Sequence, residues 1–416
     1  MQSSIQISLI TIGVIALIGI ALIGIALIGL IASLIFHRVI RRLYFSLSLF
    51  SGKEQQKSFR TIDNIFPTQT IQTSGHPRHL DYAEPLTLPS TYPYEGGNKN
   101  LKKFLEETDT TGLLIMKEGS VLFEQYYLGN TQDSKTIGWS VTKSFVSALV
   151  GIALSEGHLN SIEESITNYI PELKESAYNQ VSIKNILQMS SGVRWNEDYS
   201  DFNSDINRFR RIFALGRPLK KFMLTLDREF EPGTFNRYNS IDTQILGILI
   251  SRITGKTLSQ YLEEKLWQPL GMESDAFWIL DGSGTEYAAG GLSATLRDYA
   301  RFGQLYLNRG TWDGKQIISE RWVQDSVTPD AAHLQPGRNP HSDFFLGYGY
   351  QWWLMDGTEG EFSAIGIYNQ FIYVNPTRSV VIVKTSANRN YGTTNGKASY
   401  RELETIELFR EISRSL

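Results

Sequence analysis

The chain has 416 residues and a formal net charge of −3, and 41% of its residues are hydrophobic. A chain of this length and ordinary composition can bury a core without metal or disulfide cross-links. The near-neutral charge gives no electrostatic case for binding nucleic acid. Cysteine is absent, which excludes a disulfide framework, thiolate catalysis and cysteine-ligated zinc.

The N-terminal segment is apolar throughout. No charged residue occurs from Ile5 to Phe36, and about 20 apolar residues are enough to cross the hydrocarbon core of a membrane. The segment therefore predicts a single-pass transmembrane helix, with residues 1–37 as the anchor. Two alternatives stay open. A buried core helix seldom runs this long, and a cleaved signal peptide ordinarily begins with basic residues, which the start Met-Gln-Ser-Ser lacks.

The residues that flank this span bear on its orientation. His37, Arg38, Arg41 and Arg42 follow the span, and no basic residue precedes it. Basic flanks favour the cytoplasmic side of a membrane, so this pattern places the large domain in the cytoplasm. The family resemblance described below favours an extracytoplasmic domain instead. We favour the extracytoplasmic side, and the conflict stays open.

Residues 38–96 are predicted to form a juxtamembrane segment and linker. From Phe66 to Gly97 the chain is rich in Pro, Thr, Ser and Gly, which is typical of loops. His76 and His79 have a spacing that would place them on one face of a helix, as a metal pair requires. Pro77 disfavours that helix. We therefore interpret the two histidines as part of a solvated loop and expect no metal site.

The rest of the chain, residues 97–416, is predicted to be one folded domain. Its patterns of apolar and β-branched residues, with turn and cap signals between them, give strands, then helices, then strands and a final helix. That order predicts one sheet split in sequence, with an all-helical insertion between its parts. The expected elements are strands at 113–116 and 121–128, helices from Ser140 onward, over 242–254 and over 295–308, strands at 370–374 and 379–385, and a helix over 400–414.

The tetrapeptide Ser140-Val-Thr-Lys143 carries the main chemical signal. Residues three apart share a helix face, and a serine hydroxyl is a weak nucleophile until a neighbouring base takes its proton. A lysine can be that base when burial favours its neutral form. A serine at a helix N-terminus also places its N–H where an acyl oxyanion would form. Alone, the motif equally fits an N-cap serine followed by a surface lysine.

The surrounding sequence distinguishes these interpretations. Trp139–Gly151 resembles the first motif of the β-lactamase-related serine hydrolases, a superfamily that includes class C β-lactamases, DD-peptidases, esterases and 6-aminohexanoate-dimer hydrolase. Four further segments resemble that family's landmarks in the same order, so the resemblance covers roughly residues 97–416. These segments are Ile186–Gly192, Glu231–Ser240 with Gln244–Gly247, Gly290–Gly303, and Phe362–Gln370 followed by Asn375-Pro376.

The resemblance implies a fold and a chemistry. The fold would be a β-lactamase-like α/β fold, an antiparallel sheet flanked by helices plus an all-helical subdomain, with the active site between the two parts. Neither a cofactor nor a metal is implied. The substrate would be a small-molecule ester or amide.

Individual residues take roles from the same resemblance. Ser140 would attack the carbonyl and Lys143 would accept or relay its proton. Tyr238 would act as a base in acylation and as a proton donor to the leaving group; a packed core tyrosine is the alternative. The oxyanion hole would consist of the backbone N–H groups of Ser140 and Ile367, just past the substrate-binding Gly366.

Two positions depart from the family's pattern. The family often has Tyr-x-Asn where this chain has Tyr238-Asn239-Ser240, so Ser240 is a candidate group for orienting the substrate. β-Lactamases and DD-peptidases usually carry Lys-Thr-Gly or His-x-Gly where this chain has Ala364-Ile365-Gly366. Without that cation a substrate carboxylate is held less well, which favours an esterase or linear amidase over a β-lactamase.

Aromatic residues near the motifs are candidates for lining a pocket. Tyr199 resembles a tyrosine near the scissile amide in 6-aminohexanoate-dimer hydrolase, which implies contact with substrate; an aromatic residue of a surface loop is the alternative. A second group consists of side chains that would line a pocket wall or pack in the core. This group is Tyr348, Tyr350, Trp352 and Trp353.

We therefore predict a membrane-anchored serine hydrolase that cleaves an ester or linear amide through an acyl-enzyme on Ser140. The alternative is a catalytically weak binding or scaffolding protein, because a fold does not by itself establish a function. The presence of Lys143 and Tyr238 beside Ser140 in the motifs favours the hydrolase. Gly-x-Ser-x-Gly is absent, which disfavours an α/β-hydrolase.

Overall fold

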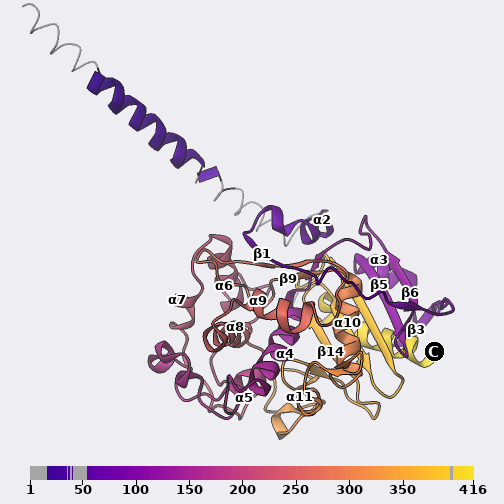
Figure 1. Ribbon diagram of the computed structural model, residues 1–416. Helices are drawn as coiled ribbons and strands as arrows, with labels where there is room; N and C mark the ends of the chain where they lie inside the picture. The colour runs from indigo at the N-terminus through magenta and orange to yellow at the C-terminus, as the bar shows by residue number, and fades with distance from the viewer. Residues whose placement is uncertain (1–15, 35, 38–39, 41–53, 394–396) are drawn as a thin grey trace, which may run out of the picture.

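The computed structural model describes residues 16–34, 36, 37, 40, 54–393 and 397–416 (Figure 1). Of the predicted anchor, the described part is a helix over Ala16–Leu34, with a mean hydropathy of 2.7 and none of it buried. It projects away from the folded body, so the alternative of a buried core helix is wrong. A helix of this length and composition fits a membrane span and also a signal sequence. Arg38, Arg41 and Arg42 lie outside the described residues.

An eight-stranded sheet forms the centre of the folded body. Its strand order is β12-β13-β14-β15-β16-β5-β6-β2, and its pairs are antiparallel except for the parallel pair of β2 and β6. Strands from the C-terminal part of the chain thus continue a sheet begun near its start, as the sequence predicts. The strands are β12 (Gly347–Tyr348), β13 (Trp353–Leu354), β14 (Phe362–Gly366), β15 (Gln370–Asn375), β16 (Val380–Ser386), β5 (Thr110–Lys117), β6 (Ser120–Tyr126) and β2 (Asp81–Tyr82).

Helices cover both faces of this sheet, which explains why β15 and β16 are buried along their whole length. On one face, α10 (Leu296–Leu307) packs against β15, β16 and β5. Gly303 of α10 permits this approach, since a Cβ there would lie 2.8 Å from a methyl carbon of Ile372. On the other face, α13 (Glu402–Ser415) places Phe409 5.5 Å from the ring of Phe371.

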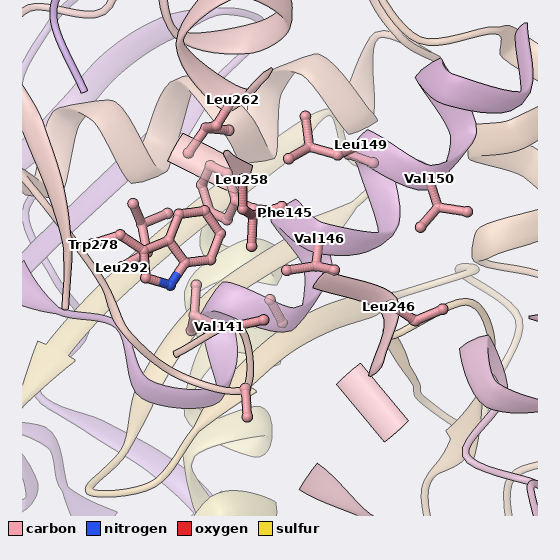
Figure 2. Close-up of a cluster of buried hydrophobic side chains, with 14 of the residues drawn as sticks. Val141, Phe145, Val146, Leu149, Val150, Leu246, Leu258, Leu262, Trp278 and Leu292 are labelled. Carbon is pink, nitrogen blue, oxygen red and sulfur yellow. The ribbon is translucent and has the colours of Figure 1, made fainter. Parts of the chain in front are cut away.

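A mostly helical region lies beside the sheet, on the left of Figure 1. Its central helix, α4 (Thr142–Ser155), is buried at every residue from Thr142 to Ala153, as expected for a helix that is apolar on all sides. Figure 2 shows α4 side chains such as Phe145 packed among Leu258, Leu262 and Trp278. The other α-helices of this region are α5 (Ile183–Leu187), α6 (Asp205–Ala214), α7 (Lys220–Met223), α8 (Ser240–Thr254) and α9 (Leu258–Leu262).

A second sheet, of four strands, leads the chain into α4. Its order is β1-β8-β9-β7, and its last strand ends just before the short 3₁₀ helix η2 (Trp139–Val141) that precedes α4. These strands are β1 (Thr68–Ile71), β8 (Ala276–Ile279), β9 (Leu292–Ala294) and β7 (Thr136–Ile137). The smaller elements are α2 (Gln55–Arg60), the hairpin β3 (Thr91–Tyr94) and β4 (Gly97–Asn100), α3 (Leu101–Glu107), the hairpin β10 (Thr311–Trp312) and β11 (Lys315–Gln316), and α11 (Glu320–Ser326).

The segment 54–96 differs from the spacer expected of its composition. β1 pairs with β8, and β2 pairs with β6, so this segment adds a strand to each of the two larger sheets. Phe59 of α2 is also buried, with its ring centroid 5.3 Å from that of Trp139. The pattern of residues did not reveal β1 because only Ile71 of its side chains is buried. Backbone pairing holds the strand, and backbone pairing leaves little trace in the sequence.

The predicted fold is confirmed: an antiparallel sheet flanked by helices, with a largely helical part beside it. The elements expected along the chain correspond to β5, β6, α8, α10, β15, β16 and α13, with ends close to those predicted. The helix expected to begin at Ser140 starts as the 3₁₀ turn η2 and becomes α-helical at Thr142.

Candidate active site

A cavity of about 850 Å³ lies between the helical region and the large sheet. We call it the main cavity. Ser140 lines it together with side chains from both parts of the domain, and most of the exposed lining is apolar, as in many small-molecule sites. Its wall includes Glu197, Tyr199, Tyr238, Trp353, Gly366, Ile367, Tyr391 and Glu402.

Ser140 occupies a sharp turn between β7 and α4. The preceding residue, Trp139, has a φ of 48°, in the left-handed region that bulky residues rarely adopt. Gly138 lies beside the Tyr299 hydroxyl, and a Cβ there would be only 2.6 Å from that oxygen. Ser140 is 9% exposed. Backbone strain of this kind gathers at functional sites, because the surrounding packing has to maintain it.

Lys143 lies one helical turn beyond Ser140 and faces it. Its Nζ donates hydrogen bonds to Ser140 Oγ at 2.8 Å and to the carbonyl oxygen of Ala289 at 2.6 Å. Burial lowers the pKa of Lys143 to about 8, while the charge of Glu197 acts in the opposite direction. A fraction of the lysine is therefore neutral near pH 7, and the neutral amine can accept the proton of Ser140.

Tyr238 completes the group around Ser140. Its ring stacks on Trp353 with centroids 5.2 Å apart, and Lys143 Nζ lies 5.1 Å from the centroid of Tyr238. Burial and then the charge of Glu197 raise the pKa of Tyr238 well above its ordinary value, whereas a hydrogen bond with Ser140 opposes the rise. The phenol is therefore protonated, which suits a proton donor better than the base that the family resemblance implies.

The two expected oxyanion donors come from adjoining segments. Gly366 ends β14 directly against the turn of Ser140, and a Cβ on Gly366 would overlap the carbonyl oxygen of Gly138 and lie 3.2 Å from the Ser140 nitrogen. Only glycine allows this approach. Ile367 follows in the turn to β15 and also lines the main cavity. This placement is compatible with a pair of N–H donors beside one carbonyl oxygen.

Glu197 is a site residue that the sequence reasoning missed. Its carboxylate accepts hydrogen bonds from the hydroxyls of Tyr199 at 2.6 Å and Ser240 at 2.7 Å, and from the indole N–H of Trp195. Its charge acts on the pKa of Lys143 and of the tyrosines around it. The available signal was a carboxylate two residues before Tyr199, a residue already suspected of contacting substrate.

The structure divides the residues expected to contact substrate. Tyr199 and Gly366 line the main cavity. Ser240 does not, and it lines a smaller cavity behind Ser140. Because the Ser240 hydroxyl donates to Glu197, its position suits the orientation of that carboxylate.

The four aromatic residues from 348 to 353 also differ in whether they line the cavity or pack in the core. Trp353 lines the main cavity, and Tyr348 is buried edge-on to Tyr238, with centroids 6.1 Å apart. Tyr350 and Trp352 belong to the core, where they pack against Trp322 and Tyr306. Of these four residues, Trp353 is therefore the one that lines the main cavity.

The histidines of the N-terminal loop are not part of this site. His76 and His79 are both exposed, and His79 Nδ1 lies 3.9 Å from the Glu273 carboxylate. Within the described ranges, no group of three or more His, Cys, Asp or Glu side chains is arranged to hold a metal ion.

The fold matches that of solved structures of β-lactamases and penicillin-binding proteins. Residues 98–406 match the family model described as Beta-lactamase, so the chain belongs to the β-lactamase family. It is similar to 6-aminohexanoate-dimer hydrolase from Paenarthrobacter ureafaciens, with 32% identity over 296 residues, 69% of this chain and 75% of that protein. The resemblance inferred from the motifs is thereby confirmed, and the chain is a hydrolase of this family.

Solved structures agree on the fold. One titled "Putative 6-aminohexanoate-dimer hydrolase from Bacillus anthracis" superposes with a TM-score of 0.78 at 24% identity, covering 88% of this chain and 95% of that one. A class C β-lactamase in complex with cefoxitin gives a TM-score of 0.55 at 16% identity, covering 76% and 96%. At these identities the likeness concerns the fold alone.

Proposed function

We propose that this chain is a serine hydrolase that cleaves a linear amide or ester through an acyl-enzyme on Ser140. The observation that carries the proposal is the buried Lys143 Nζ, 2.8 Å from a Ser140 hydroxyl that opens onto the main cavity. A nucleophile within hydrogen-bonding distance of a base with a lowered pKa is the arrangement that nucleophilic catalysis requires.

The residues suggest an order of proton transfers. Neutral Lys143 takes the Ser140 proton as Oγ attacks the carbonyl carbon, and the oxyanion accepts hydrogen bonds from the N–H groups of Ser140 and Ile367. Tyr238 then donates its proton to the departing nitrogen or oxygen and regains one from Lys143. The acyl group stays on Ser140 until water cleaves the ester.

The charges around the main cavity indicate which substrates it favours. Among the described residues, its three arginines are all engaged in ion pairs with carboxylates. By contrast, neither Glu197 nor Glu402 forms an ion pair there; Glu402 accepts a hydrogen bond from the Tyr391 hydroxyl at 2.5 Å. A cavity with unpaired carboxylates and no free cation disfavours an anionic substrate. The ion pairs are Arg194 with Asp227, Arg237 with Glu229 and Asp343, and Arg401 with Glu107 and Glu404.

This charge pattern fits the third motif, where Ala364-Ile365-Gly366 lacks the cation that β-lactamases use. It supports an uncharged or amine-bearing acyl chain over a penicillin-like acid. The similarity to 6-aminohexanoate-dimer hydrolase supports a linear amide over an ester as the physiological bond. A binding or scaffolding role has no comparable observation in its favour.

We also propose the domain arrangement expected from the sequence. Residues 1–37 anchor the chain in a membrane, and residues 97–416 form the hydrolase domain. Residues 38–96 connect them, and the described part of this connection packs onto the domain.

Labelling with a fluorophosphonate probe tests the function. The full chain in detergent micelles is treated with the probe, and intact-mass measurement and peptide mapping locate the adduct. We expect one adduct, on Ser140, which is lost in Lys143→Ala and kept in Lys103→Ala, an exposed lysine outside the cavity. A folded protein that takes up no probe would refute the hydrolase and favour the binding or scaffolding alternative.

A further inference from the structure

A second, much smaller cavity lies behind Ser140, and we call it the rear chamber. Its volume is about 10 Å³, close to the roughly 10–15 Å³ that one water molecule needs. Ser140, Tyr199 and Ile367 line both the rear chamber and the main cavity. The rear chamber therefore adjoins both the reacting serine and the main cavity.

Tyr287 supplies an unsatisfied polar group to this chamber. Its side chain is only 7% exposed and packs against the rings of Phe213 and Phe209, at 4.9 Å and 5.7 Å between centroids. Its hydroxyl has no hydrogen-bond partner in the part of the chain that the structure describes. Buried hydroxyls are almost always hydrogen-bonded, to protein or to ordered water. A chamber of water size beside the unpaired hydroxyl of a buried tyrosine indicates a water site.

The general base reaches the boundary of the same chamber. Lys143 Nζ hydrogen-bonds Ser140 Oγ and the carbonyl oxygen of Ala289, and both of those residues line the rear chamber. Ser240 and Tyr199 line it too, but their hydroxyls already donate to Glu197. Two further donors of the lining, Arg210 and Trp139, have partners of their own. Tyr287 is therefore the available donor to a water oxygen, and Lys143 is the nearby proton acceptor. Burial keeps the Tyr287 pKa above its ordinary value, against the opposing charge of Arg210, so the hydroxyl stays protonated.

We propose that the rear chamber binds the water that hydrolyses the acyl-enzyme, and that Tyr287 is the residue that positions it. This inference rests on the acyl-enzyme of the proposed function. The water oxygen attacks the carbonyl carbon of the Ser140 ester while one water proton passes to neutral Lys143, forming a tetrahedral oxyanion. When the oxyanion collapses, the bond from carbon to Ser140 Oγ breaks and Oγ takes the proton back from Lys143. The products are the free acid and the serine hydroxyl, and the acid leaves through the main cavity.

The separation of the two cavities has a kinetic consequence. The leaving group departs through the main cavity, and water reaches the acyl carbon from the rear. Loss of the Tyr287 hydroxyl should slow deacylation and spare acylation. A small nucleophile that enters through the main cavity should then bypass the defect.

The test is Tyr287→Phe in the full chain in detergent micelles, with p-nitrophenyl hexanoate as substrate. The burst of p-nitrophenol reports acylation, the steady state reports deacylation, and quenched mass spectrometry reports the occupancy of acyl-Ser140. We expect the steady-state rate to fall about tenfold, as for loss of one positioning hydrogen bond. The burst rate should stay within about twofold of the wild type, and added hydroxylamine should restore turnover.

Tyr306→Phe is the matched control, because Tyr306 is a buried tyrosine of α10 that lines neither cavity. It should leave both phases unchanged. An acyl-Ser140 adduct whose decay is as fast in Tyr287→Phe as in the wild type would overturn the water site alone. Equal slowing of both phases without rescue by hydroxylamine would also overturn it, as a structural effect. No acyl-Ser140 adduct in the wild type would overturn the proposed function and the water site together.

Discussion

Two buried lysines occupy different regions of this molecule, and only one of them contacts a side chain that lines the main cavity. Lys143 at the start of α4 contacts Ser140 at the edge of the main cavity. Lys384 in the middle of β16 is fully buried, donates to Ser386 Oγ, and lies 5.6 Å from the ring centroid of Phe104. Burial lowers the pKa of both, and for Lys384 the charge of Arg401 lowers it further.

The comparison separates two properties that are easily treated as one. A lowered pKa supplies a neutral amine near pH 7, and both lysines have it. Catalysis also needs a nucleophile within reach and space for a substrate. Lys143 hydrogen-bonds Ser140, which lines both cavities, whereas Lys384 hydrogen-bonds Ser386, which lines neither. The neutral amine of Lys384 is therefore a product of packing in the sheet. The predictions below test this distinction.

The largest expected effect is that of Lys143→Ala on activity. Loss of a general base costs between a hundredfold and ten-thousandfold, and we expect kcat/KM for a linear amide to fall about a thousandfold. Circular dichroism shows whether the variant remains folded. A folded variant that retains most of its activity would remove Lys143 from the mechanism.

Lys384→Met should show the opposite behaviour. We expect kcat/KM to stay within about threefold and the free energy of unfolding at pH 7 to rise by about 1–3 kcal/mol, because an apolar side chain replaces a buried amine. In the wild type the unfolded state binds the extra proton between the lowered folded pKa and the ordinary value, so stability rises with pH in that window. The stabilising effect of Lys384→Met should therefore shrink as pH approaches about 10.

Guanidinium unfolding at pH 7 and pH 10, followed by tryptophan fluorescence, measures this difference. A variant that loses activity while remaining folded would contradict the distinction between the two lysines.

Glu197→Gln tests the electrostatic support of the reactive lysine. The kcat/KM of the wild type should rise with pH as Lys143, whose pKa is about 8, loses its proton. The charge of Glu197 raises the pKa of Lys143, so its removal should move this rise to lower pH. A pH profile of kcat/KM from 5.5 to 9.5 measures the shift. Asp205→Asn, at another carboxylate of the cavity wall, serves as the control, and equal shifts in both variants would argue against a specific role for Glu197.

The smallest expected effect concerns the charge of the substrate. Glu402→Gln should raise the KM of an amine-bearing amide about threefold to fivefold, as for loss of a modest charge interaction. The KM of the matching uncharged amide should stay the same. Glu407→Gln, on the same helix but outside the cavity, is the control. An equal change for both amides would contradict the proposed preference.

The sequence alone determined the parts of the site that are local along the chain. Ser140 and Lys143 are three residues apart, across the passage from η2 into α4. The order of the five motifs identified the family and, with it, Tyr238. The strands β5, β6, β15 and β16 and the helices α8 and α10 were predictable because buried elements carry runs of apolar residues bounded by turn and cap signals. These features depend on neighbours within a few residues.

The tertiary structure decided what distant segments build together. The role of Glu197 depends on Tyr199 and Ser240, whose hydroxyls meet at its carboxylate. The role of Tyr287 depends on its place in the lining of the rear chamber beside Ser140. Segment 54–96 joins both sheets through backbone hydrogen bonds, which any sequence can make. The physical reason is that burial and the approach of charges set a side chain's pKa and its access to substrate. Both are properties of packing between segments, and for that reason Lys143 and Lys384 cannot be told apart by residue type alone.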